Sequence, residues 1–118
     1  MAGYRPLLTL MGEVLEGTVK ADAILIGPCS QQDIGAIQEA IDAVVLTCPI
    51  AWRKHFTGSI TAPDMSLADI TGPLDEAMDD FRNTGPLHIV FVPDAATFAA
   101  LPKALRGRMH HVEPAAVA

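Results

Sequence analysis

The sequence predicts an α/β domain, a mostly parallel β-sheet of about four strands flanked by helices. Two observations favour this class. Amphipathic stretches with helical spacing alternate along the chain with short continuous apolar runs, as helices alternate with buried strands in such folds. The apolar runs end at glycine or proline, where a strand leaves its sheet. The alternative is an α+β two-layer sandwich with a mixed sheet, in which one edge strand runs antiparallel.

The first elements are a helix and a buried strand. A helix is expected over residues 6–20, because apolar side chains recur there every three or four positions opposite a polar stripe. Residues 23–27 form a continuous apolar run that Pro28 closes, which is typical of a strand buried on both faces. Ser30 can then cap a second helix, with Asp33 in the fourth position of a capping box.

A second strand is predicted directly after this helix. Residues 43–48 are apolar and rich in β-branched side chains, and Pro49 ends the run. Residues 23–49 are therefore predicted to form a βαβ unit whose two strands are parallel neighbours. Cys29 and Cys48 would then lie at the same edge of the sheet, where open α/β sheets bind their ligands.

The middle of the chain is the least regular part of the prediction. Residues 50–72 are expected to form an irregular excursion, within which residues 59–62 could form a strand. Pro73 fits the first turn of the next helix, because a missing N–H costs no hydrogen bond there. The run LHIVFV at residues 87–92 is the strongest strand signal in the chain. Residues 73–113 are thus predicted to form the second half of the domain, with the element order helix, strand, helix, strand.

The C-terminal elements follow from their proline and glycine residues. A helix through Leu101 should break at Pro102, which cannot continue it without a kink. A short turn to Arg106 follows, then a last strand at residues 109–113 and a loose tail at residues 114–118. The whole chain, residues 1–118, is expected to be one domain, since this length can bury a core without a disulfide or metal.

Composition limits the classes of function. The formal net charge of −6 argues against generic nucleic-acid or anionic-membrane binding, which depends on clustered cations. A nucleic-acid role would need Arg53, Lys54, Arg106 and Arg108 on one face. The two cysteines have no CxxC spacing and fit no disulfide framework, so a reducing cytoplasm is expected. Apolar runs are too short for a signal peptide or a membrane span, so we expect a soluble protein.

Three residues are candidates for catalysis. Cys29 lies near a helix N-terminus, which stabilises a thiolate, but a small buried side chain is the favoured interpretation. Cys48 could form a redox pair with Cys29 if the two strands are adjacent. His55 would add a third potential ligand, yet a zinc site would still lack the fourth. We expect no metal and no cofactor.

Carboxylates and histidines give further candidates. Asp75 and Asp79 stand four residues apart on one helical face, as do Glu76 and Asp80, which predicts a solvated acidic face or a contact with a basic partner. His110 and His111 are consecutive, so in a strand they point to opposite faces and cannot chelate one metal as a pair.

His88 begins a strand and is expected to be a structural histidine with its hydrogen bonds satisfied. Arg106 and Arg108, with the two consecutive histidines, form a mildly basic spot that is expected to be ordinary solvated surface.

High apolar content in a small acidic chain predicts a non-catalytic subunit that binds itself or another protein, such as an accessory, inhibitory or phage-type structural component. The chain contains no GxGxxG, Walker, GxSxG or HExxH motif. Aromatic and arginine side chains outside a regular core are typical interface anchors. The expected contact residues are Trp52, Arg53, Lys54, His55, Phe56, Asp79 and Asp80. The alternative is a small cysteine-dependent enzyme, or an anion- or small-molecule-binding domain, that uses Cys29, Ser30 and Cys48.

Overall fold

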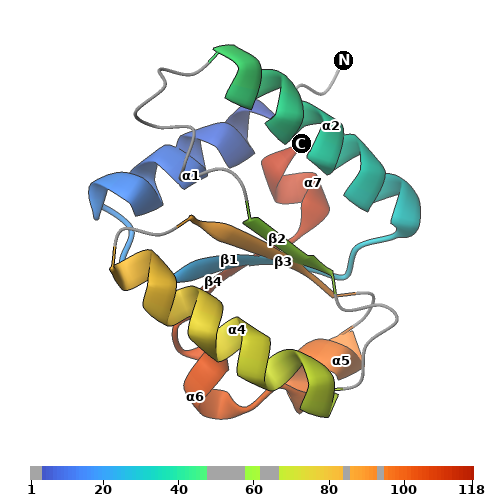
Figure 1. Ribbon diagram of the computed structural model, residues 1–118. Helices are drawn as coiled ribbons and strands as arrows, with labels where there is room; N and C mark the ends of the chain where they lie inside the picture. Colours follow the sequence, from blue (N-terminus) through green and yellow to red (C-terminus); the bar gives the residue numbers. More distant parts are fainter. Residues whose placement is uncertain (1–3, 48–57, 62–66, 84–85, 93–94) are drawn as a thin grey trace.

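The chain folds around a parallel sheet with helices on both faces (Figure 1). The computed structural model describes residues 4–47, 58–61, 67–83, 86–92 and 95–118. The predicted class, a compact single α/β domain with a parallel sheet flanked by helices, is confirmed by this arrangement.

The sheet has the strand order β2-β3-β1-β4, and each neighbouring pair is parallel. Its strands are β1 (Ala23–Ile26), β2 (Gly58–Thr61), β3 (His88–Phe91) and β4 (Met109–Val112). In the register of the central strand, Ile24 lies between Ile89 of β3 and His110 of β4. All residues of β1 are buried, because this strand has a neighbour on each side and helices on both faces.

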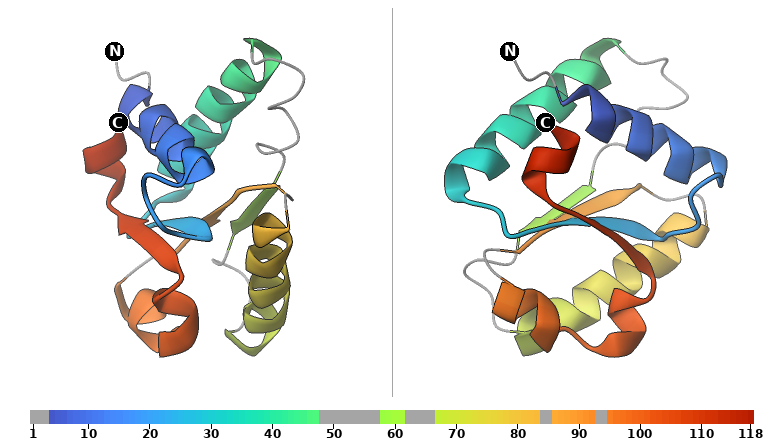
Figure 2. Two further views of the ribbon diagram at one scale, coloured as in Figure 1. Left: turned by 90° about the vertical axis from the view of Figure 1, so that its left-hand side faces the viewer. Right: turned by 180° about the vertical axis from the view of Figure 1, so that it is seen from behind.

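The helices form two layers. They are α1 (Arg5–Glu16), α2 (Gln31–Thr47), α4 (Leu67–Arg82), α5 (Ala95–Ala100), α6 (Lys103–Arg106) and α7 (Pro114–Val117). Figure 2 shows α1, α2 and α7 on one face of the sheet and α4, α5 and α6 on the other. The core is correspondingly divided, since Ile24 and Ile26 of β1 pack in the first cluster and Ala23 and Leu25 in the second.

Some predicted boundaries are correct and others are shifted. Helix α1 is shorter than predicted and ends at Gly17, whose φ of 81° is left-handed and whose N–H donates to the carbonyl of Val14. Pro102 separates α5 from α6, as predicted, and Gly107 follows α6. Strand β2 lies within the excursion where a strand was considered, one residue earlier than the expected range.

The predicted strand at residues 43–48 is wrong. Helix α2 continues through Thr47, and the parallel neighbours of β1 are β3 and β4. The predicted βαβ unit at residues 23–49 is therefore wrong as well. A short apolar run suits a buried helix as well as a strand. Because residues 36–48 contain neither glycine nor proline, nothing in the sequence stops the helix once it has formed.

Two other predictions need correction. Pro73 does not begin a helix but lies inside α4, which starts at Leu67 and thus takes in the end of the predicted excursion at residues 50–72. The tail is not loose, because α7 forms there with Pro114 in its first turn. Val117 of α7 is 3% exposed and packs in the first core cluster.

Candidate functional site

The segments that leave β1 and β3 pack against each other at the carboxyl end of the sheet. The N–H of Val92 donates to the carbonyl of Ile26 at 3.1 Å, and the N–H of Cys29 donates to the carbonyl of Val92 at 2.9 Å. Gly27 allows this approach, because a Cβ there would overlap the side chain of Val92. The chain leaves these two strands toward opposite faces, which is where α/β sheets open a ligand crevice. In the described residues, backbone contacts occupy this position.

Cys29 lies in an environment opposite to that of a nucleophilic thiol. It is 3% exposed, and burial, with a smaller effect from the charge of Asp33, raises the pKa of its thiol to about 11. Reactive cysteines need the reverse shift, toward the thiolate at neutral pH. Ser30 acts as the predicted cap, since its Oγ accepts a hydrogen bond from the N–H of Asp33 at 3.1 Å.

The remaining sequence candidates in this region lie outside the described residues. They are Cys48, Trp52, Arg53, Lys54, His55 and Phe56. Residues 43–47 of the predicted strand are helical.

A pocket of about 400 Å³ opens beside the carboxyl ends of β1 and β4. It is lined by Tyr4, Pro28, Asp33, Glu113, Pro114, Ala115 and Ala118. The two carboxylates on its wall would disfavour an anion in this pocket. Among the described residues, no group of three or more His, Cys, Asp or Glu side chains is placed to hold a metal ion.

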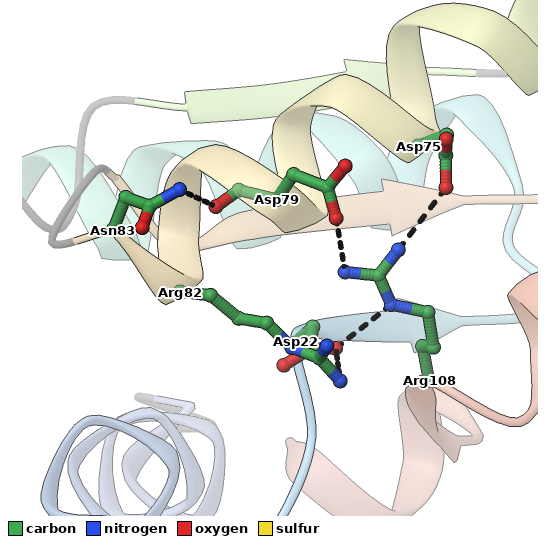
Figure 3. Close-up of polar contacts among 6 residues, drawn as sticks. All are labelled: Asp22, Asp75, Asp79, Arg82, Asn83 and Arg108. Carbon is green, nitrogen blue, oxygen red and sulfur yellow. Dashed lines mark hydrogen bonds and ion pairs between the residues drawn. The ribbon is translucent and has the colours of Figure 1, made fainter.

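The amino ends of the strands carry a charged cluster centred on Arg108 (Figure 3). Its guanidinium donates through Nε to Asp22 at 2.8 Å, through one terminal nitrogen to Asp75 at 3.0 Å and through the other to Asp79 at 2.8 Å. Arg82 adds a second contact to Asp22 at 2.9 Å. One planar cation therefore connects the segment before β4, the segment before β1 and two turns of α4.

The cluster shifts the pKa values of Asp22 and Arg108. Burial acts to raise the pKa of Asp22, but hydrogen bonds and charge from Arg108 and Arg82 outweigh it and hold this pKa below its usual value. The hydrogen bond that Arg108 donates to Asp22 in turn raises the pKa of Arg108. Asp75 and Asp79 are more than half exposed, yet both carboxylates bind this arginine of their own chain. Asp79, a predicted contact residue, thus already has an intramolecular partner. Asp80, also a predicted contact residue, is exposed.

The sequence contains a signal for this cluster. Asp22 directly precedes the first buried strand, and Arg108 directly precedes the last. When two strands are parallel neighbours, opposite charges at matching positions just before each strand come into contact. The spacing of Asp75 and Asp79 did predict a shared helical face, but not the internal cation that occupies it.

His88 differs from its predicted role. Its Nδ1 is buried and has no hydrogen-bond partner among the described residues, so the expected satisfied histidine is wrong at this atom. Burial lowers the pKa of His88, although the charge of Asp80 acts in the opposite direction. The neutral imidazole is the form that such a site favours.

A stack of three side chains lies beside β4. The ring centroids of Phe98 and His111 are 4.3 Å apart with an interplanar angle of 20°, and the Cζ of Arg106 lies 5.8 Å from the Phe98 centroid. His111 Nε2 lies 3.0 Å from the carbonyl of Gly27. Because a carbonyl can only accept, Nε2 is the donor in this contact. The exposed His111 ring is thus held in one orientation.

Comparison of the chain with protein-family models, with curated proteins and with solved structures gives no match. None of the helices in the described part of the chain is both long enough and apolar enough to cross a membrane. The contacts, burial and charges of the described residues are therefore the observations that bear on function.

Proposed function

We propose that this chain is a non-catalytic subunit that binds a protein, itself or another chain, along the open edge of strand β4. The uneven distribution of its exposed alanines carries this proposal. Among alanines whose side chains are described, those exposed outside α2 gather in or next to α5, α6 and α7. They are Ala96, Ala99, Ala100, Ala104, Ala115, Ala116 and Ala118.

These helices flank one edge of the sheet, and we call β4 with these alanines the β4 edge. Strand β4 pairs with β1 on one side and is the last strand in the described sheet. Figure 2, in its right-hand view, shows β4 in front of the other strands, with α7 above it and α5 and α6 below. Small side chains on both flanks leave room for another backbone to reach the strand.

The sequence of β4 supports the same conclusion. Proteins that keep a sheet edge unpaired commonly protect it with lysine, proline, a bulge or a covering segment. Strand β4 reads MHHV and contains neither lysine nor proline. An edge strand whose outer backbone donors and acceptors are unpaired is the usual docking place for an added strand.

The described polar groups lend less support to an enzyme. Cys29 is buried with a raised pKa, and the guanidinium of Arg108 is engaged by three carboxylates that hold the fold together. The alternative site at Cys29, Ser30 and Cys48 therefore has less support than protein binding. The predicted contact residues at positions 52–56 remain part of the proposal as a second contact region.

Site-specific photocrosslinking in the native cells tests the proposal. A photoreactive amino acid placed at Ala104 or Ala116 should give covalent adducts with a protein, because both positions flank the β4 edge. Glu39 is the matched control, since it is also exposed and lies on a helix, but in α2. Adducts at both edge positions and none at Glu39 are expected. No adduct at either edge position, or equal adducts at all three, would contradict the proposal.

A further inference from the structure

We infer that the partner at the β4 edge is a second copy of this chain, paired antiparallel through β4 across a twofold axis at His110. This inference rests on the proposed function and names the partner. It follows from three features of β4: the direction of its free backbone groups, the register that they allow and the charges at its two ends.

The directions of the free groups follow from the hydrogen bonds at the two ends of β4. The carbonyl of Val112 accepts from the N–H of Gly27 at 3.1 Å, and the carbonyl of Arg108 accepts from the N–H of Asp22 at 2.7 Å. Both carbonyls therefore point toward β1. Because the backbone groups of successive residues in a strand point to opposite sides, those of Met109 and His111 point away from β1.

The register follows from the residue beyond the strand. Glu113 also has an outward position, but its carbonyl already accepts from the N–H of Ala116 at 3.0 Å as α7 begins. Met109 and His111 thus offer the available N–H and C=O pairs. Antiparallel pairing of Met109 with His111 of the second copy, and the reverse, uses all of these groups. His110 then lies opposite His110 of the second copy, on the symmetry axis.

Charge selects the antiparallel direction and makes the edge complementary to itself. Arg106 lies three residues before β4, where its Nε donates to the carbonyl of Leu101 at 3.0 Å, and Glu113 directly follows the strand. The proposed register places Glu113 opposite Gly107 of the second copy, next to the Arg106 end of that chain. The twofold axis repeats this contact, so each Glu113 lies near Arg106 of the other copy. A parallel pairing would instead place like charges side by side.

The flanking helices agree with a twofold contact. The exposed alanines lie on both faces of the sheet, in α7 on one face and in α5 and α6 on the other. When β4 meets its copy, these helices approach their own copies along the same axis. Alanines allow close approach and lose no side-chain conformational entropy when they are covered.

Sedimentation analysis of the purified full chain over a range of concentrations is the first test, and a reversible dimer is expected. His111→Pro removes an outward N–H from each copy and no hydrogen bond to β1. It should weaken the dimer by at least about tenfold, at roughly 1 kcal/mol for each lost hydrogen bond. His111→Ala is the matched control, because it also removes the imidazole but keeps the N–H. It should weaken the dimer clearly less than His111→Pro, with an unchanged circular dichroism spectrum for both.

Disulfide trapping tests the register. Residues opposite each other in a non-hydrogen-bonded antiparallel pair have Cα atoms about 4.5 Å apart, within the range that a disulfide spans. His110→Cys should therefore form an intermolecular disulfide on mild oxidation, which peptide mass mapping would assign to position 110 in both chains. Glu39→Cys, exposed on α2, should not form a dimer.

The outcomes separate this inference from the proposed function. A chain that stays monomeric at every concentration, or that links through a position other than 110, overturns the inference. If the monomer gives photocrosslinks at Ala104 and Ala116 to a different protein, the proposed function stands and only the choice of partner falls. If those positions give no adduct as well, both fall.

Discussion

The two ends of the parallel strands are held together by different forces. At the amino ends, Arg108 joins Asp22, Asp75 and Asp79 through charged hydrogen bonds. At the carboxyl ends, Gly27 and Val92 meet by close packing and neutral backbone contacts. The sheet is the same at both ends, but one end depends on ionisation and the other on shape. We therefore expect the two ends to respond differently to substitution and to pH.

The largest effect is expected at the packed end. Gly27→Ala would introduce a Cβ that overlaps the side chain of Val92 and lies 3.1 Å from its carbonyl oxygen. We expect the free energy of unfolding to fall by about 3 kcal/mol, the upper part of the range for overpacking, because backbone as well as a side chain must shift. Urea denaturation followed by circular dichroism measures this loss.

Gly35→Ala is the control for that substitution. A Cβ at Gly35 would meet nothing within 4 Å, and the residue lies within α2. Alanine is the better helix former, so this variant should gain up to about 1 kcal/mol. Equal losses from both substitutions would show that the contact between Gly27 and Val92 does not hold this end of the sheet.

A smaller loss is expected at the charged end. Arg108→Met keeps much of the side-chain volume but leaves Asp22, which is 13% exposed, without its main hydrogen bond. We expect about 2 kcal/mol of destabilisation, since a partly buried carboxylate loses a charged partner. Arg82→Met, at a side chain that is 63% exposed, should cost less than about 1 kcal/mol. A larger loss from Arg82→Met would place the centre of the cluster at the wrong arginine.

The smallest effect concerns pH and involves the charged end alone. Because the pKa of Asp22 is lower in the folded chain than in the unfolded chain, its contribution is complete above the unfolded pKa of about 3.9. That contribution is lost as pH falls below this value toward the folded pKa. Urea titrations between pH 6 and pH 3 should therefore show the stability difference between the wild type and Asp22→Asn shrinking with acidity. A difference that stays constant would contradict the ionic account, and Gly27→Ala should show such a constant difference.

Much of the fold was accessible from local sequence. The apolar runs that became β1 and β3 and the break at Pro102 depend on neighbouring residues and were found. Residues 43–48 were not, because an apolar β-branched run suits either helix or strand until its packing partners are known. The helical tail was missed in part because four residues are too few for a periodic signal, although Pro114 marked its start.

The candidate site was less accessible than the fold. Cys29 was placed correctly at the end of β1, and its interpretation as a small buried side chain agrees with its burial. The raised pKa of its thiol could not be predicted from sequence, because it depends on the groups packed around it. The acidic face of α4 was predicted from the spacing of Asp75 and Asp79. Its partner was not, because Arg108 lies 33 and 29 positions away from these two residues.

The sequence by itself determined the alternation of helices and apolar strands and most of the points where they end, since those depend on a few adjacent side chains. Only the tertiary structure decided which strands are neighbours. The order β2-β3-β1-β4 brings Arg108 to Asp22 across 86 positions and leaves β4 at an edge. Strand order is set by the packing of whole elements against one another. It therefore cannot be inferred from the residues adjacent to each strand.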